Sequence, residues 1–211
     1  MSDQSGHETG KPFLYVVVCA AGIAGDVGRL ISAAQEAGWE VGVVATPQGL
    51  GFIDAPAIEA QTGYSIRSAW RSPGDPRPLP DPDAIAVVPA TFNTINKWAA
   101  GISDSLALGI LCESYGLGVP TAVLPHVNTA LAAHPAYAES LRRLRDMGVL
   151  VGSCEPPRPK SGGGADRFRW EEALELLSSG VTGRVGRPAP VSWHGVNGAV
   201  PCALVRRTRE R

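Results

Sequence analysis

Thr91, Asn93 and Thr94 follow an apolar run directly, in the stretch VVPATFNT, and bring two hydroxyl groups and one amide to a single turn. One polar side chain is enough to cap a helix, so this turn carries more hydrogen-bonding groups than its own backbone needs. Pro89 and Ala90 present the main chain close beside these side chains. The array suits the edge of a planar heteroaromatic ring, where hydrogen-bond donors and acceptors stand in a row.

Two further turns carry groups that suit a phosphate. In CAAGIAGD, Ala21 and Gly22 let a ligand approach the backbone next to the first amides of a helix, which is a favourable place for an anion. The stretch lacks the GxGxxG spacing, and a tight turn also needs small residues. Thr46, after the next apolar run, either binds the same phosphate through its hydroxyl or caps the turn that follows.

The patterns that must position these turns alternate between strand and helix. Short apolar runs predict strands, and amphipathic spacing that stops at glycine or proline predicts helices. We expect strands over 14–19, 40–45, 84–88, 118–125 and 149–152, a weaker strand over 64–69, and helices over 26–37, 52–62, 95–115 and 128–147. Such alternation predicts parallel pairing and a three-layer, doubly wound α/β sheet. These sheets bind ligands beyond the carboxyl ends of their strands, where the three turns would meet.

The remaining segments are less regular. Five prolines within residues 72–82 predict a surface loop. We expect one domain with its core over residues 12–152, a flexible loop over 153–167, an amphipathic helix over 168–178, and a C-terminal extension over 180–211. Asn197 and Gly198 predict a hairpin turn within that extension.

Composition limits the classes of function. The 211 residues carry a net charge of -1, with 44% hydrophobic and 18% charged residues, which disfavours a disordered chain and an electrostatic nucleic-acid binder. The sequence contains no apolar run of membrane-spanning length, so we expect a cytoplasmic protein. The cysteines lack the spacing of a metal site or a disulfide framework and stand at positions Cys19, Cys112, Cys154 and Cys202.

Two motifs resemble those of the homo-oligomeric flavin-containing cysteine decarboxylases. The first, VVPATFNTINKWAAGISDSL, resembles that family's PASANT segment, with Thr91 in place of its serine. The second, LPHVNTALAAHPAYAESLRRLRDMGV, is similar to the family's Pro-x-Met-Asn-x-x-Met-Trp segment, in which Pro125 and Asn128 fall in register. Val127 and Leu131 depart from it. The similarity extends from Phe13 to about Val151.

The resemblance implies a flavodoxin-like subunit that binds FMN at a trimer interface, in a trimer or a multiple of trimers. It assigns the FMN phosphate or ribityl chain to Gly22, Ile23 and Thr46. It assigns the flavin ring to the turn made by Pro89, Ala90, Thr91, Phe92, Asn93 and Thr94. Asn128 would contact the carboxylate or amide of a thiol-bearing substrate. The implied reaction is oxidative decarboxylation of a cysteine-type substrate, such as the C-terminal cysteine of a peptide, to an enethiol.

The chain departs from this family in its catalytic groups. The family carries a histidine a short distance before the PASANT proline, whereas the corresponding stretch here is RSPGDPRPLP. His126, beside Asn128, is the candidate replacement base, and a partly exposed loop histidine is the alternative interpretation. His134 before Pro135 is expected to end or kink a helix. The family's cysteine-bearing lid is also missing, since the surroundings of Cys154 do not match it.

Two functions therefore follow as hypotheses. The first is an FMN-dependent lyase that releases an enethiol, with Asn93, Asn128 and His126 as the catalytic residues. The second is an FMN-binding partner or regulatory subunit that has lost the catalytic histidine.

Overall fold

The computed structural model describes residues 10–153, 156–158 and 167–181. Its centre is a parallel five-stranded sheet with the strand order β2-β1-β3-β4-β5. The strands are β1 (Phe13–Val18), β2 (Glu40–Ala45), β3 (Ala84–Ala90), β4 (Thr121–Pro125) and β5 (Leu150–Val151). This order and the helices on both faces confirm the predicted doubly wound, flavodoxin-like α/β fold.

Strand β1 lies inside the sheet, between β2 and β3, and its side chains divide between two hydrophobic cores. It pairs with β2 along its whole length and with β3 on its other side. All six of its residues are buried, as the continuous apolar run predicts for a strand that is covered on both faces. Leu14, Val16 and Val18 point to one core, while Phe13, Tyr15 and Val17 point to the other.

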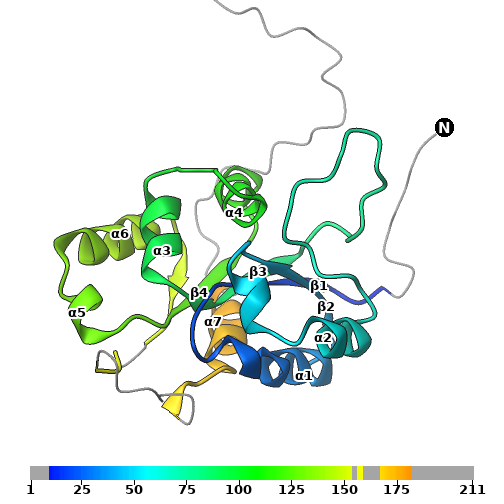
Figure 1. The fold of residues 1–211 in the computed structure, drawn as a ribbon, viewed down its shortest axis with the longest axis horizontal. Helices are drawn as coiled ribbons and strands as arrows, with labels where there is room; N and C mark the ends of the chain where they lie inside the picture. The colour runs from blue at the N-terminus through cyan, green and yellow to red at the C-terminus, as the bar shows by residue number, and fades with distance from the viewer. Residues whose placement is uncertain (1–9, 154–155, 159–166, 182–211) are drawn as a thin grey trace, which may run out of the picture.

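One face of the sheet is covered by α1 (Gly28–Glu36), α2 (Ala55–Thr62) and α7 (Glu172–Val181), which lie together below the sheet in Figure 1. Short 3₁₀ turns, η1 (Ala24–Val27) and η2 (Gly49–Phe52), precede the first two helices. Trp170, just before α7, is fully buried in this core. The predicted C-terminal helix is therefore present, although it begins at Glu172 rather than at residue 168.

The other face is covered by α3 (Phe92–Ala99), α4 (Leu106–Leu117) and α6 (Pro135–Asp146), with the short helix α5 (Thr129–Ala132) before α6. Trp98 is buried here, and its indole N–H donates to the carbonyl of Leu111 at 3.0 Å. Over β1 and β2, the described residues place no helix on this face. The proline-rich segment lies there, with Leu79 in the core and the Pro80 carbonyl accepting the Tyr15 hydroxyl at 2.6 Å.

Three predicted elements were wrong in extent. The single helix expected over 95–115 is two helices, because Gly101 takes a φ of 74° after α3 and the chain reverses before α4. The helix expected over 128–147 is divided between α5 and α6 at His134 and Pro135. The weak strand expected over 64–69 is reduced to one bridge between Arg67 and Val44.

Some predictions fall beyond the residues that the structure describes. The hairpin lies there, as do the C-terminal extension after residue 181 and most of the loop over 153–167. Within the described ranges, no helix has both the length and the apolar character needed to cross a lipid bilayer.

Candidate functional site

The turns after β1, β2, β3 and β4 surround an open cleft of about 670 Å³ at one edge of the sheet. The crossovers that leave β1 and β3 lead to opposite sides of the sheet, which opens a crevice between their ends. The cleft is within the size range of ordinary ligand pockets. Its lining includes eight of the predicted site residues, namely Gly22, Thr46, Thr91, Phe92, Asn93, Thr94, His126 and Asn128.

The turn after β1 brings bare backbone to the cleft. A Cβ atom added to Gly22 would meet nothing within 4 Å, so the space beside this residue is open. The described residues supply no hydrogen-bond acceptor to the Gly22 amide. Ile23 lies differently, because its side chain is 5% exposed and belongs to the core rather than to the lining of the cleft.

Thr46 at the end of β2 caps the next turn. Its hydroxyl oxygen accepts a hydrogen bond from the Gly49 N–H at 3.1 Å. A Cβ atom on Gly49 would lie 2.6 Å from the carbonyl oxygen of Val18, so this tight turn requires a glycine. Of the two roles that the sequence left open for Thr46, capping is present, and the hydroxyl group, on a residue that lines the cleft, keeps its proton to donate.

The turn after β3 is arranged differently. Thr91 is the N-cap residue of α3, yet its side chain accepts no hydrogen bond from a backbone amide of the helix. Its hydroxyl lies 3.1 Å from the hydroxyl of Thr94 instead. The amides of Phe92, Asn93 and Thr94 therefore have no acceptor within the described part of the chain. Burial raises the pKa of the Cys19 thiol beneath these threonines.

The rest of this turn serves the fold. Pro89 and Ala90 are buried in β3 and do not line the cleft. The carbonyl of Ala90 accepts the His126 N–H at 2.8 Å, which ties the end of β3 to the end of β4. The Phe92 ring stacks on Tyr137 of α6 with 6.1 Å between centroids, so its position is fixed by packing. Asn93 is exposed at the mouth of the cleft.

The end of β4 supplies a histidine and an asparagine. The His126 ring is half-buried and meets the edge of Phe168 at a centroid distance of 5.7 Å. Burial lowers the pKa of His126, so its imidazole is neutral near pH 7 and can accept a proton. The Asn128 side-chain oxygen caps α5 by accepting the Leu131 N–H at 3.0 Å, which leaves its NH₂ group as a donor.

The sequence-based reasoning missed two charged residues of the cleft. Lys97 of α3 and Asp104 form an ion pair there, although both lie within residues 87–106, the first of the two family-like motifs. The signal available was Gly101 between them, which ends the helix and turns the chain back toward Lys97. Gln48 and Leu108 also line the cleft without having been predicted. Among the described residues, no three His, Cys, Asp or Glu side chains come together as a metal site.

Two relatives match slightly more than half of the chain. A mouse phosphopantothenoylcysteine decarboxylase is 32% identical over 124 residues, which cover 56% of this chain and 60% of the mouse protein. The chain thus spans less than two thirds of that relative. A probable phosphopantothenoylcysteine decarboxylase from Arabidopsis thaliana is 28% identical over 120 residues, 53% of this chain and 59% of its own length.

Solved structures agree in fold. The FMN-dependent cysteine decarboxylase TvaF from thioviridamide biosynthesis superposes with a TM-score of 0.64 at 24% identity, over 80% of this chain and 99% of its own. A variant of PPC decarboxylase in complex with pantothenoylaminoethenethiol gives the same TM-score at 23% identity, also over 80% and 99%.

The model of the family described as Flavoprotein matches residues 1–165, which include every strand of the sheet and every residue of the cleft. The two motifs that carried the resemblance in the sequence lie within the same residues. This chain therefore belongs to the flavoprotein family.

Proposed function

We propose that the cleft binds FMN and that the chain catalyses the oxidative decarboxylation of a cysteine-type substrate. The donor set supports the cofactor. An FMN molecule presents a phosphate, hydroxyl groups and a ring edge with carbonyl oxygens, all of which accept hydrogen bonds. The Gly22 amide and the amides of the first turn of α3 lack acceptors within the described residues and border the same cleft. Helix N-termini favour such acceptors.

The strand ends divide the cofactor between them in this proposal. The open backbone at Gly22 and the Thr46 hydroxyl hold the phosphate or the ribityl chain. The amides of Asn93 and Thr94 meet the polar edge of the ring. Ile23, Pro89 and Ala90 do not line the cleft; they are buried and hold the turns in position.

The substrate is a thiol in which the carbon next to the sulfur-bearing carbon carries a carboxylate, as in a C-terminal cysteine. When bound, FMN supplies the acceptor for a hydride from the carbon that bears sulfur. Neutral His126 would take the thiol proton, and with both the proton and the hydride removed the C–S single bond becomes a thiocarbonyl. The carboxylate is then beta to that group. Its C–C bond breaks, carbon dioxide leaves, and the electron pair moves to sulfur as an enethiolate that takes up a proton.

Asn128 orients the substrate. Its side-chain oxygen is engaged at the start of α5, which fixes the direction of its NH₂ group. That group donates to the carboxylate or to the preceding amide of the substrate. Relatives named as cysteine decarboxylases, one of them FMN-dependent, support this choice of substrate class.

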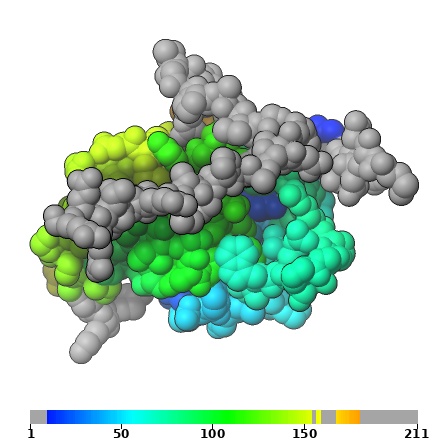
Figure 2. Space-filling view, turned by 90° about the horizontal axis from the view of Figure 1, so that it is seen from above, coloured from blue at the N-terminus to red at the C-terminus, as the bar shows by residue number. Residues whose placement is uncertain are grey.

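Exposed apolar side chains support a homo-oligomer, as a trimer or a multiple of trimers. Trp70 is 59% exposed and Tyr115 is 62% exposed, on the side of the molecule that carries α4. Figure 2 shows this side, with the proline-rich segment (teal) next to α4 (green). A cleft of about 500 Å³ separates them. Large aromatic side chains are enriched at protein interfaces and are rarely left exposed in groups.

The uncapped first turn of α3 inside the cleft is the observation that carries this proposal. The test begins with the purified protein, whose flavin content is measured by absorbance and by the mass of the released cofactor. The protein is then incubated with a peptide that ends in cysteine. We expect bound FMN and a peptide product lighter by one carbon dioxide and two hydrogens. Light scattering on the same preparation gives the subunit number.

A second function is favoured by one observation, the absence of histidine from residues 71–80 before β3. An FMN-binding partner or regulatory subunit would retain FMN but leave every thiol peptide unchanged in mass. A protein without FMN would contradict both functions.

A further inference from the structure

The cleft contains one residue with a fixed positive charge and one with a fixed negative charge among its described lining. These are Lys97 and Asp104, and the other lining residues are small, apolar, hydroxyl-bearing or amide-bearing, apart from the neutral His126. A ligand with a carboxylate therefore finds a single cation with which to pair.

Helix geometry directs Lys97 toward the same ligand as Asn93. The two residues are four apart on α3, so they lie on the same face of the helix, one turn from each other. Both line the cleft. A ligand whose ring edge meets Asn93 accordingly has the Lys97 ammonium group as its next neighbour along α3.

The ion pair with Asp104 holds this ammonium group in place. Gly101, with a φ of 74°, reverses the chain after α3, and the Ile102 N–H donates to the Lys97 carbonyl at 2.9 Å. Asp104 returns to Lys97 just before Ser105 starts α4. An ammonium group has three N–H donors, and Asp104 is its acceptor among the described residues. Two donors thus remain for a ligand.

Stability alone does not account for this arrangement. The Lys97 and Asp104 side chains are 33% and 50% exposed, and ion pairs this open to water add little to the stability of a fold. Asp104 also balances the charge, so the cleft does not hold a strong cation that would retain any anion. A carboxylate that enters between Asn93 and Asn128 can pair with Lys97 while Asp104 keeps its own hydrogen bond.

We infer that Lys97, oriented by Asp104, is the specificity-determining residue that selects ligands with a free carboxylate. The inference rests on the proposed function, because it names the group by which that substrate is recognised. Asn128 then holds the amide that precedes the carboxylate, and neutral thiols are poor ligands.

The test measures binding of a tripeptide that ends in serine, which has no thiol and cannot be oxidised. Calorimetry with the FMN-loaded protein compares the free acid with the C-terminal amide of the same tripeptide. We expect the acid to bind at least about tenfold more tightly, the effect of one charge-assisted hydrogen bond. Lys97→Met should bring the two affinities together, Lys97→Arg should keep most of the difference, and added salt should reduce it.

The matched control is Arg145→Met, which removes an exposed cation of α6 that does not line the cleft. It should leave the acid-to-amide ratio unchanged, so that a general effect of net charge is separated from a local one. An unchanged ratio in a folded, FMN-retaining Lys97→Met variant would overturn the inference, as would a wild-type protein that binds both tripeptides equally or neither. Flavin content is measured independently, so a loss of FMN would count against the proposed function instead.

Discussion

Five helices of this protein that begin after a loop or turn start in two different ways, whereas α1 continues from η1 with the apolar Val27 at its N-cap. Four of them start with a side chain that accepts a first-turn amide, and these side chains belong to Asp54, Ser105, Asn128 and His134. Helix α3 starts with Thr91, which has the right chemistry for a cap and directs its hydroxyl to another hydroxyl instead. In all five of these helices the sequence supplies a side chain that can cap, and only the Thr91 side chain is not used in that way.

This contrast indicates where the chain leaves backbone amides free for a ligand. A missing cap costs a helix on the order of 1 kcal/mol. The protein bears that cost at α3, whose first-turn amides face the cleft and are available to an acceptor from outside the chain. Helices α4 and α5 also begin at the cleft, but Ser105 and Asn128 cap them. At α2, which begins away from the cleft, Asp54 makes the ordinary bond to the Ala57 amide at 3.2 Å.

The largest effect is expected when α3 is given the cap that it lacks. In Thr91→Asp, the carboxylate would accept the amides of the first turn and would repel a phosphate or an electron-rich ring edge. FMN affinity should fall by at least about tenfold, while the free energy of unfolding stays the same or rises by up to about 1 kcal/mol. Titration with FMN, followed by flavin fluorescence, and chemical denaturation measure the two quantities.

The control for this variant acts on a helix of the other kind. Asp54→Ala removes the cap of α2 and should lower the free energy of unfolding by about 1 kcal/mol without changing FMN affinity. If Thr91→Asp retained FMN as well as the wild type does, the free amides of α3 would have no part in binding FMN. The uncapped start of α3 would then have no functional role.

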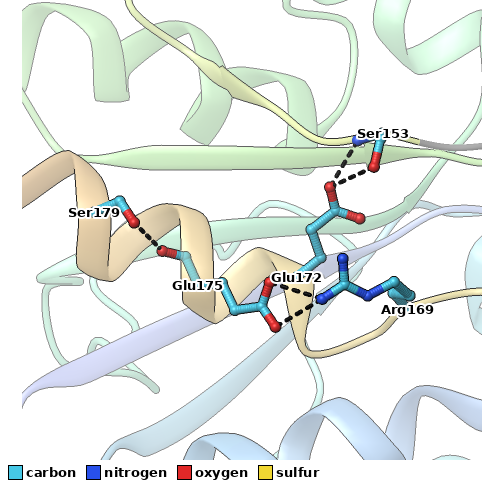
Figure 3. A network of polar contacts seen from close by, with 5 residues as sticks. All are labelled: Ser153, Arg169, Glu172, Glu175 and Ser179. Carbon is cyan, nitrogen blue, oxygen red and sulfur yellow. Dashed lines mark hydrogen bonds and ion pairs between the residues drawn. The ribbon is translucent and has the colours of Figure 1, made fainter.

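The second largest effect is expected at α7, where the carboxylate of the first residue, Glu172, accepts hydrogen bonds from a residue outside the helix. Glu172 is 8% exposed and accepts hydrogen bonds from the Ser153 N–H and the Ser153 hydroxyl, both at 2.8 Å (Figure 3). These bonds fasten the residues after β5 to the helix. Glu172→Ala should lower the free energy of unfolding by about 2–3 kcal/mol, because it removes a buried, charged acceptor that holds two hydrogen bonds from Ser153.

A matched variant lies in the same network. Arg169 pairs with Glu175 at 2.8 Å, but these side chains are 62% and 57% exposed (Figure 3). Arg169→Ala should therefore change the free energy of unfolding by less than about 1 kcal/mol. Equal losses in the two variants, measured by denaturation in urea, would show that burial does not govern the strength of these contacts.

Much of the fold could be predicted because its signals are local. The apolar runs of β1 and β2 and the glycine that stops α1 need no knowledge of the rest of the chain. The breaks inside the predicted helices over 95–115 and 128–147 were harder, since both halves are helical in pattern and only Gly101 and Pro135 mark the breaks. The same holds for the site, where local features could be predicted and features that depend on the path of the chain could not. Thr91 and Asn93 could be found from their type, whereas the pairing of Lys97 with Asp104 depends on a reversal of the chain.

The smallest expected effect is on the pH dependence of stability, and it distinguishes the two histidines near the cleft. His134 uses its Nδ1 as the cap of α6, accepting the Ala136 N–H at 3.2 Å, whereas His126 rests against Phe168 and lines the cleft. Burial lowers the pKa of His126 below its ordinary value in the folded chain. The unfolded chain therefore binds the proton more tightly, and the stability present above the ordinary pKa is lost as the pH falls through the folded one.

His126→Gln removes this proton site, so the variant should lose less stability than the wild type between about pH 7 and pH 5. Denaturation curves at several pH values measure the difference, and the ring signals of His126 in an NMR titration report its pKa directly. Binding of FMN should lower that pKa further, because a cofactor over the cleft excludes water from a ring that is now half-exposed. A pKa that rose instead on FMN binding would place the phosphate, rather than the uncharged part of the cofactor, beside His126.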